Sequence, residues 1–458
     1  MSASAPESGN FWLSIILRRP YTLSATLFLA LFVIPFCTRK QSDWEYVYIP
    51  AAQRLFEGKD VFEGGFVYPP INAWLMLPFV GMPRIPARLL WFALNGTALF
   101  ILICGAWKVS GGGPLEGSPP ASRREHMIFG LGLLCGIYYA FDALTNQQTD
   151  LLVAALVIAG CQALGRRSDW KTGLLIGVAA GVKCTPLLWA GYLAWRKRWA
   201  SALLVPVVAV GINLLPDLTH PPATSMPRIE DWGRRFLAPM AESDHDLGTW
   251  ASAILHNHSL AGVSNRWLTW ESTRRQGKTE VAARADRVGP NTLKVVGLGS
   301  MLLFFTAAWF CSWKGGRRPG FALFNSEETA PSPAALEYSL VLILMLLLCP
   351  QSSKPHFCTL LLPGFCLTRA ALTWPSRPLK VLVLLIVACG LVSNKDLVGG
   401  RVYDWALWHG SVTLSAVLLH AGCCVALILP TRRATALPGV ASNETAGTSF
   451  NRPILKAS

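Results

Sequence analysis

The chain has 458 residues, of which 52% are hydrophobic and only 15% are charged, and its formal net charge is +15. This composition excludes an ordinary soluble domain, because the apolar residues fall in repeated runs close to the length that spans a bilayer. The excess of Lys and Arg is typical of loops beside anionic lipid headgroups, and no DNA- or RNA-binding motif is present. We therefore expect membrane lipids, and no nucleic acid, as partners.

The hydrophobic runs predict an all-α polytopic membrane protein with about 10 to 12 transmembrane helices, since about 20 apolar residues cross the hydrocarbon core. The runs lie near residues 13–36, 86–107, 127–142, 149–165, 172–182, 185–195, 199–215, 292–313, 334–350, 356–372, 379–393 and 406–430. The runs at 172–182 and 185–195 are too short to cross alone, and glycines and Pro186 interrupt them. We expect broken or re-entrant helices there, enclosed by protein.

Positive charges concentrate in alternate connections between these runs: Arg123-Arg124, Arg166-Arg167, Arg196-Lys197-Arg198, Lys314 with Arg317-Arg318, Arg377 with Lys380, and Arg432-Arg433. The side of the membrane that carries them should be cytoplasmic, which places both termini inside. The segments 37–85, 216–291 and 351–355 then meet on the extracytoplasmic side. We expect one membrane domain over 1–430, with 216–291 as a long outer loop, and a cytoplasmic, disordered tail over 431–458.

The first outer segment carries the most informative carboxylate. Asp43 follows the first predicted span, and the step Tyr68-Pro69-Pro70 lies further along the same segment. A carboxylate held at a membrane surface, beside aromatic and proline-stiffened chain, is a candidate general base. The alternative for Asp43 is a helix N-cap, and the Tyr-Pro-Pro step is equally typical of a helix start at an interface. Between them, the stretch from Pro50 to Glu57 predicts a short helix that ends at Gly58.

Two polar features interrupt the apolar part of the chain. The run Asn146-Gln147-Gln148-Thr149-Asp150 separates two hydrophobic segments. Asn146 and Gln147 can hydrogen-bond a polar ligand, or the run can be a tight turn with Asp150 at a helix start. Lys183 lies between the two short helical pieces. A cation at membrane depth is costly, so Lys183 is a functional candidate with a phosphate as its natural partner, unless it only reaches the interface.

Candidates also lie in the long outer loop. Asn257, His258 and Arg266 are interpreted as binding a polar ligand, with loop packing as the alternative. His256 and His258 lack an evident third ligand, so a metal site is not indicated. The Asp244-His245-Asp246 pattern binds metal–nucleotide sugars in soluble transferases, and such donors are not expected on the outer side. We predict no metal and no cofactor.

The last candidates are Lys354 and His356, which lie at the boundary between an outer segment and a span. Histidine can protonate or orient a leaving group near neutral pH, and a lysine beside it can attract an anion. The alternative is an ordinary interfacial pair.

Taken together, these positions resemble glycosyltransferase family 87, whose members are polytopic bacterial enzymes of the GT-C type. The resemblance runs from about residue 40 to 370 and is carried by Asp43, Tyr48, Ala51-Ala52, Gly58, Tyr68-Pro69-Pro70, Asn146-Gln147-Gln148-Thr149-Asp150, Gly177, Gly181, Lys183, Pro186, Asn257, Ser259-Leu260, Gly262 and Arg266. It implies a GT-C bundle in the bacterial plasma membrane, with the active site on the extracytoplasmic side. Two departures are His258, where the family has Gln, and Ser353-Lys354-Pro355-His356, where a Ser-Trp-x-His pattern is common.

The resemblance further implies a membrane glycosyltransferase that moves a hexose, with mannose favoured, from a polyprenyl-phosphate-sugar donor to an extracytoplasmic lipid or glycan acceptor. Asp43 would be the general base that takes the proton of the acceptor hydroxyl. The donor phosphate would be neutralised by Lys183, Arg266, Lys354 and His356. The substrate-binding side chains would be Tyr68, Asn146, Gln147, Asn257 and His258.

Two other classes of membrane protein stay open at this point. A flippase or transporter for a lipid-linked sugar would also use broken helices and a cation at membrane depth, although no inverted repeat is apparent. A membrane O-acyltransferase could use His256 or His258 as its base. The product distinguishes the three classes, since it is a new glycoside, a translocated lipid or an acyl ester.

Overall fold

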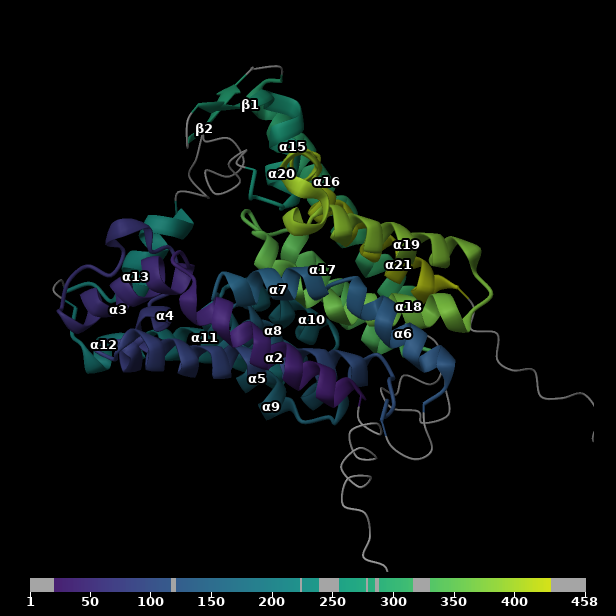
Figure 1. The fold of residues 1–458 in the computed structure, drawn as a ribbon, viewed down its shortest axis with the longest axis horizontal. Coiled ribbons are helices and arrows are strands. Elements are labelled where there is room, and N and C mark those ends of the chain that lie inside the picture. The colour runs from purple at the N-terminus through teal and green to yellow at the C-terminus, as the bar shows by residue number, and fades with distance from the viewer. Residues whose placement is uncertain are drawn as a thin grey trace, which may run out of the picture.

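The computed structural model describes residues 20–116, 121–222, 225–238, 255–276, 279–284, 288–315 and 330–429; the predicted tail 431–458 and the Asp244-His245-Asp246 pattern lie outside these ranges. Within them the regular elements are helices apart from one two-stranded hairpin. Figure 1 shows long helices lying side by side in a bundle, with the hairpin standing away from it. The predicted all-α class is confirmed.

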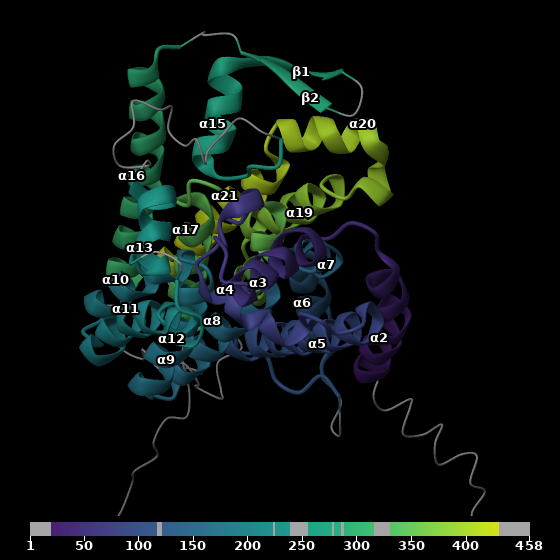
Figure 2. The same cartoon turned by 90° about the vertical axis from the view of Figure 1, so that its left-hand side faces the viewer.

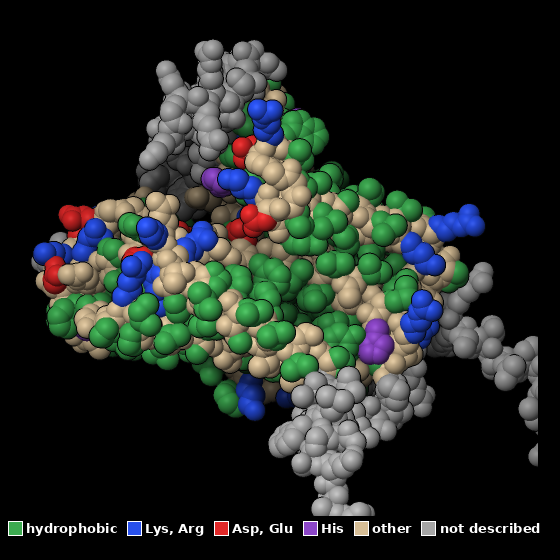
Figure 3. All heavy atoms as spheres, in the orientation of Figure 1, with side chains coloured by type: hydrophobic (Ala, Val, Ile, Leu, Met, Phe, Trp, Pro, Cys, Tyr) green, Lys and Arg blue, Asp and Glu red, His purple; other side chains and the backbone are tan. Residues whose placement is uncertain are grey.

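Five helices among the described residues are long and apolar enough to cross a membrane. They are α2 (Pro20–Thr38), α5 (Arg84–Val109), α11 (Trp199–Asn213) continued through α12 (Leu215–Thr219), α16 (Pro290–Gly315) and α21 (Ser411–Ile428). The number rises to seven if two bent pairs each count as one span: α6 (Arg123–Leu134) with α7 (Ile137–Thr145), bent by 48°, and α19 (Arg377–Val392) with α20 (Lys395–Trp408), bent by 92°. Exposed hydrophobic side chains cover the flank of the bundle between its charged ends (Figure 3). The protein is therefore a multi-pass membrane protein.

The centre of the bundle is made by helices that are apolar on all sides. α17 (Pro333–Leu347) and α18 (Leu361–Thr373) are buried along almost their whole length, and most of α8 (Asp150–Gly165) is buried as well. A helix that is hydrophobic all round belongs in the interior of a large protein or a membrane bundle. α17 and α18 pack against each other and against α21, while α5 packs on both α8 and α18. These helices form the scaffold on which the shorter elements rest.

Helices α9 (Asp169–Val182) and α11 approach closely because glycines face their contact. A Cβ added at Gly173, Gly177 or Gly181 would lie 2.7, 2.7 or 2.4 Å from a side-chain atom of α11. Small residues at every fourth position let membrane helices approach to backbone distance. The prediction that these glycines interrupt the helix is wrong, because α9 continues through them. It ends at Lys183, before η4 (Thr185–Leu187) and the short α10 (Leu188–Trp195), so the two predicted short pieces are present.

The segment between α2 and α5 folds into short helical turns. A π-helical turn, η1 (Trp44–Tyr48), leads into α3 (Ile49–Phe56), and Gly58 follows with a φ of +70°. Glycine adopts this left-handed conformation without steric cost. The helix predicted from Pro50 to Glu57 is confirmed with a shift of one residue. Beyond it lie η2 (Glu63–Gly65), α4 (Ile71–Leu75) and η3 (Leu77–Phe79).

Residues 216–291, predicted as one long loop, contain regular elements. These are α13 (Arg228–Trp232), the π-helical turn η5 (Gly233–Leu237), α15 (Leu260–Thr269) and an antiparallel hairpin of β1 (Trp270–Gln276) and β2 (Thr279–Arg284). In Figure 2, α15, the hairpin and α20 lie together along one edge of the bundle. None of these pieces contains an apolar run of spanning length, so hydropathy alone could not find them.

Candidate active site

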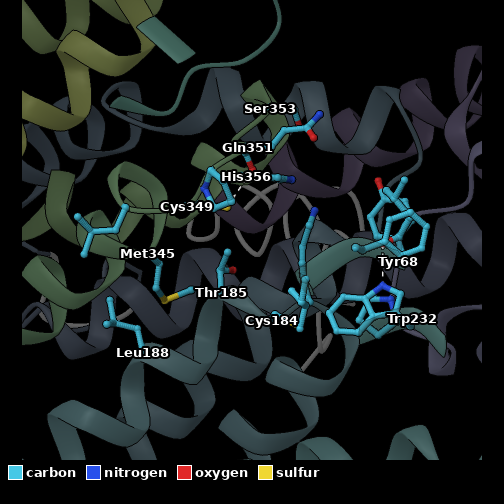
Figure 4. A pocket seen from close by; sticks show the side chains of 17 residues that line it. Tyr68, Cys184, Thr185, Leu188, Trp232, Met345, Cys349, Gln351, Ser353 and His356 are labelled. Atoms are coloured by element: carbon cyan, nitrogen blue, oxygen red, sulfur yellow. Dashed lines mark hydrogen bonds between the residues drawn. The ribbon is translucent and has the colours of Figure 1, made fainter. Parts of the chain in front are cut away.

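A cavity of about 360 Å³ lies at the end of the bundle that carries the short turns. Its lining comes from Val67–Pro69 before α4, Lys183–Thr185 after α9, side chains of α13 and η5, and the chain that follows α17, including Ser353 and His356. Figure 4 shows the side chains of Tyr68, Trp232 and His356 around this space. Most of the wall is apolar, with a few polar groups among it, which is the usual composition of small-molecule sites.

Lys183 stands at the end of α9, and its ammonium group is held by a carboxylate. The Lys183 Nζ donates to Asp150 Oδ1 at 2.8 Å and to Asp150 Oδ2 at 2.9 Å, and both side chains are almost fully buried. The same Nζ lies 5.6 Å from the centre of the Tyr68 ring, within the range of a cation–π contact. The sequence indicates a cation at membrane depth with a phosphate as its natural partner. The structure pairs it with Asp150, a residue that the sequence indicated only as a possible helix start.

His356 joins the same group from η6 (Lys354–Leu360). Its Nε2 lies 3.7 Å from Asp150 Oδ1, and its imidazole lines the cavity. Burial and the nearby Lys183 ammonium lower the pKa of His356 to about 4, so the ring is neutral at pH 7. We call Lys183, Asp150 and His356 the cavity cluster. It consists of one cation, one anion and one neutral imidazole.

Asp43 is not among the residues that line the cavity, but it lies close enough to Lys183 and Asp150 for their charges to act on it. Its backbone N–H donates to Asn146 O at 3.2 Å, and Gln148 Nε2 donates to Asp43 Oδ2. The Asp43 side chain makes no capping hydrogen bond to η1, so the N-cap interpretation is wrong. Burial raises the pKa of Asp43, and the Gln148 hydrogen bond opposes that rise, because an amide donor favours the ionised carboxylate.

Gln147, predicted to bind substrate, is used inside the protein. It adopts a φ of +58°, which is uncommon for a residue other than glycine. Its Nε2 donates to Phe36 O at 2.7 Å, and its carbonyl accepts from Trp91 Nε1 at 3.0 Å. Gln147 therefore joins the end of α2 to α5 and to the turn before α8.

The two amides beside it have different partners. Asn146 Oδ1 accepts from Arg39 Nη2 at 3.1 Å, and Asn146 Nδ2 donates to Asp142 Oδ2 at 3.1 Å. Neither Asn146 nor Gln147 lines the cavity. Gln148, which the sequence placed in the same polar run without a role, is the amide that contacts Asp43.

Lys354 points away from the cavity lining to a partner of its own. Its Nζ donates to Asp142 Oδ1 at 3.2 Å and lies 5.4 Å from the centre of the Tyr403 ring on α20. This contact joins η6 to α7 and α20, and it leaves Lys354 outside the cavity cluster.

Arg266 is fully buried and bonds to main-chain carbonyls. Its Nη1 donates to Asn257 O at 2.6 Å, and its Nη2 reaches Leu407 O at 3.5 Å near the end of α20. Burial lowers the pKa of Arg266 to about 10, so the guanidinium remains charged at neutral pH. The arrangement ties α15 to α20 at a distance from the cavity lining.

Asn257 and His258 hold the chain that follows α17. Asn257 Oδ1 accepts from the backbone N–H groups of Ser259 at 3.1 Å and Ser352 at 3.2 Å. The His258 N–H donates to Ser352 O at 2.7 Å, and the His258 carbonyl accepts from Thr413 Oγ1 at 2.6 Å. The His258 ring is fully buried, and burial keeps its pKa well below the usual value.

The positions Asn257, His258, Arg266 and Lys354 thus share one feature, since they join loops and helices around the cavity without lining it. We call them the fastening cluster. Among the described residues, no group of three or more His, Cys, Asp or Glu side chains is placed to share a metal ion. The site itself offers a buried carboxylate that can accept a proton, next to an ammonium and an imidazole that can contact an anion.

Fold and site together define a class of protein, namely a multi-pass membrane enzyme with an ionisable cluster at one end of its bundle. The chain belongs to glycosyltransferase family 87, since the model of that family matches residues 66–350. The resemblance drawn from the sequence motifs is therefore confirmed at the level of the family. The long gap between Asp43 and the start of the matched region leaves that residue outside the match.

The chain is also similar to two curated mycobacterial proteins. One is the polyprenol-phosphate-mannose-dependent alpha-(1-2)-phosphatidylinositol pentamannoside mannosyltransferase of Mycobacterium tuberculosis, 30% identical over 153 residues, which are 33% of each chain. The other is the polyprenol-phosphate-mannose-dependent alpha-(1-2)-phosphatidylinositol mannoside mannosyltransferase of Mycolicibacterium smegmatis, 27% identical over 159 residues, covering 32% of this chain and 34% of that one. The chain thus matches about a third of the length of these relatives.

Among solved structures, the chain is similar to ArnT from Cupriavidus metallidurans bound to undecaprenyl phosphate. The TM-score is 0.37 and the sequence identity is 14%, over 90% of this chain and 77% of that chain.

Proposed function

We propose that the protein transfers a hexose, most simply mannose, from a polyprenyl-phosphate-sugar donor to a lipid or glycan acceptor. Family membership and the named relatives support the donor class. The observation that carries the proposal is the contrast between two neighbouring carboxylates. Asp150 is fixed to Lys183 by two hydrogen bonds, whereas Asp43 is bonded to an amide and has a raised pKa. Such a contrast assigns different roles to two carboxylates in one site.

Asp43 is the proposed general base. Its carboxylate takes the proton of the acceptor hydroxyl while the hydroxyl oxygen attacks the anomeric carbon of the sugar. The bond between that carbon and the phosphate oxygen breaks, and its electron pair leaves with the polyprenyl phosphate. One displacement of this kind inverts the anomeric centre. General-base assistance contributes about 10²- to 10⁴-fold in rate.

The cavity cluster is the proposed site for the phosphate. Lys183 is already oriented by Asp150, so its N–H groups need little reorganisation when negative charge develops on the leaving phosphate. His356 lies beside them as a neutral ring that can donate a hydrogen bond. Arg266 and Lys354 do not enter this proposal, because their side chains are bonded elsewhere. Tyr68 remains a substrate-binding candidate, since its ring lines the cavity.

The apolar wall offers a path for the prenyl chain. A second cavity, of about 150 Å³, lies between α10, α16 and α17 and shares Leu188 with the first. Its lining includes Leu340 and Leu344 of α17, the helix that also carries Met345 into the first cavity. Glu337 also lines this second cavity. A prenyl chain in this path would bury apolar surface along α10 and α17.

We further propose that the enzyme lies in the bacterial plasma membrane with the cavity on the extracytoplasmic side and both termini in the cytoplasm. The support is the distribution of Lys and Arg, which favours the connections after α8, α10 and α18 as cytoplasmic. Labelling of single introduced cysteines at Asp60 and at Lys197 from the outside of intact cells tests this. Labelling at Lys197 without labelling at Asp60 would contradict the proposed orientation and favour the opposite one.

The test of function uses the purified protein in nanodiscs with radiolabelled polyprenyl-phosphate mannose and lipids from the source membrane. Asp43→Asn should lower transfer by about 10²- to 10⁴-fold while the protein elutes as the wild type does. Asp60→Asn is the matched control, because Asp60 is a carboxylate of the same segment that pairs with Arg235 on the surface. Near-wild-type transfer by Asp43→Asn would exclude it as the base. No transfer by the wild type from any polyprenyl-phosphate sugar would instead favour a flippase, which a lipid-translocation assay would detect.

A further inference from the structure

Helix α20 leaves the direction of the bundle. It follows α19 after a bend of 92°, and the side chain of Asn394 accepts from the Asp396 N–H at 3.0 Å to start the new helix. An Asn in this position satisfies a helix N–H that would otherwise lack a partner. The turn is therefore built into the chain, and α20 runs along one edge of the bundle beside the hairpin (Figure 2).

One face of α20 is fastened to the protein. Ala406 and Leu407 are buried, and the Tyr403 ring contacts Lys354. The carbonyls of Leu407 and Trp408 near the end of the helix face the Arg266 guanidinium. A cation at this end satisfies free carbonyls and matches the helix dipole.

α20 is broken at Gly399, which has a φ of +75°, and it exposes apolar side chains on both sides of this break. Leu397 is 58% exposed, Val402 47% and Trp405 64%. Lys395, Asp396 and Arg401 are exposed beside them, and Asp404 is half-buried. A helix with Trp and aliphatic residues between basic residues is typical of one that lies in the lipid–water interface, where Lys and Arg extend their charges into water.

The apolar face also continues a lipid-facing surface. On α19, which precedes the bend, Val381, Leu384 and Leu391 are exposed in the same way. α19 with α20 passes the length and hydropathy criteria for a membrane segment. Exposed apolar side chains therefore lie on both sides of the bend, which itself exposes Lys395 and Asp396.

We propose that α20 is an interfacial helix whose Leu397, Val402 and Trp405 insert into the bilayer surface on the same side as the cavity. The occupant of this face is the lipid bilayer, not a protein partner. This inference does not depend on the proposed sugar transfer. Because Tyr403 contacts Lys354, and Lys354 bonds to Asp142 on α7, the helix fixes the cavity at the level of the lipid headgroups.

The test places the photoreactive amino acid benzoylphenylalanine in the full chain, in nanodiscs of phosphatidylethanolamine and phosphatidylglycerol. After irradiation, mass spectrometry detects lipid attached to the protein. Trp405 and Leu397 should give lipid adducts similar in yield to those at Leu303, which faces outward on the spanning helix α16. Tyr403 is the matched control, since it is an aromatic residue of the same helix on the fastened face. Benzoylphenylalanine at this position should give no lipid adduct.

Two results would overturn the proposal. One is the absence of lipid adducts at Trp405 and Leu397 when Leu303 gives them. The other is a cross-link from Trp405 to a second protein chain, which would make this face a protein interface. If a variant does not elute as the wild type does, Val402 replaces it as the reporter position.

Discussion

The cavity cluster and the fastening cluster each contain a lysine and a histidine, yet they stand in different surroundings. Lys183 and His356 line the cavity and share Asp150, whereas the side chains of Arg266 and Asn257 bond to main-chain groups of other elements, and His258 makes its bonds through its own main chain. Both clusters contain fully buried and half-buried side chains, so burial alone does not separate them. What separates them is the partner: side chains in the first cluster remain next to open space, and those in the second close the contacts between loops and helices.

The largest expected effect is that of Lys183→Met. The substitution removes the cavity cation and leaves Asp150 buried without its partner, which costs about 3–5 kcal/mol when one member of a buried pair is lost. Transfer should be abolished, and the midpoint of thermal unfolding should fall strongly. The double variant Lys183→Met with Asp150→Leu should regain stability but not activity. Activity in the double variant would show that the cavity cluster does not act on substrate.

Arg266→Met tests whether the fastening cluster supports stability without acting on substrate. The loss of hydrogen bonds to the carbonyls of Asn257 and Leu407 should cost about 1–3 kcal/mol of stability. Transfer per folded molecule should stay close to that of the wild type, because Arg266 does not line the cavity. Thermal unfolding and transfer are measured on the same preparation. A loss of transfer with unchanged stability would move Arg266 from the fastening cluster into the site.

Gln148→Leu tests the assignment of Asp43 through pH. Gln148 donates to Asp43, which stabilises the charged form and lowers the pKa of that carboxyl. Without this bond the pKa of Asp43 should rise further, so a smaller fraction is ionised at a given pH. The acidic limb of the kcat/KM profile should move to higher pH. An unchanged acidic limb would mean that Asp43 is not the group that must be ionised.

Lys354→Met should have the smallest effect. Its contact with Asp142 lies where both side chains keep part of their exposure to solvent, and such pairs contribute about 0–1 kcal/mol. Transfer and the unfolding midpoint should stay near those of the wild type. A drop in transfer as large as that of Lys183→Met would show that the two lysines act together on the donor.

Much of the fold follows from hydropathy, because a bilayer demands long apolar helices. The bounds of α5, α11 and α16 agree with the predicted runs to within two residues, and α2 and α21 overlap theirs. Hydropathy does not predict α20 and the hairpin, since their residues mix polar and apolar types without a long apolar run. Their placement depends on tertiary contacts such as those of Arg266 and Tyr403.

The site was predictable as a set of segments but not as a set of side chains. Asp43, the polar run before α8 and Lys183 do meet. The choice among Asn146, Gln147 and Gln148 depends on the left-handed backbone at Gln147, which turns neighbouring side chains in different directions. Asp150 was missed because a helix-start residue and an ion-pair partner have the same sequence signal. In other membrane sequences, an ion pair can be predicted when an acidic residue starts one buried helix and a lysine ends another.

The glycines of α9 fix the number of residues that can separate the last of them from Lys183. Backbone contact at Gly173, Gly177 and Gly181 fixes α9 against α11, so the helix can neither slide nor rotate. Lys183 reaches Asp150 only because it follows Gly181 by two positions. One inserted residue would turn Lys183 by about 100° and advance it by about 1.5 Å along the helix. Relatives that keep this pair should therefore vary freely in the type of residue on the far side of α9, but not in the number of residues between its last glycine and the lysine.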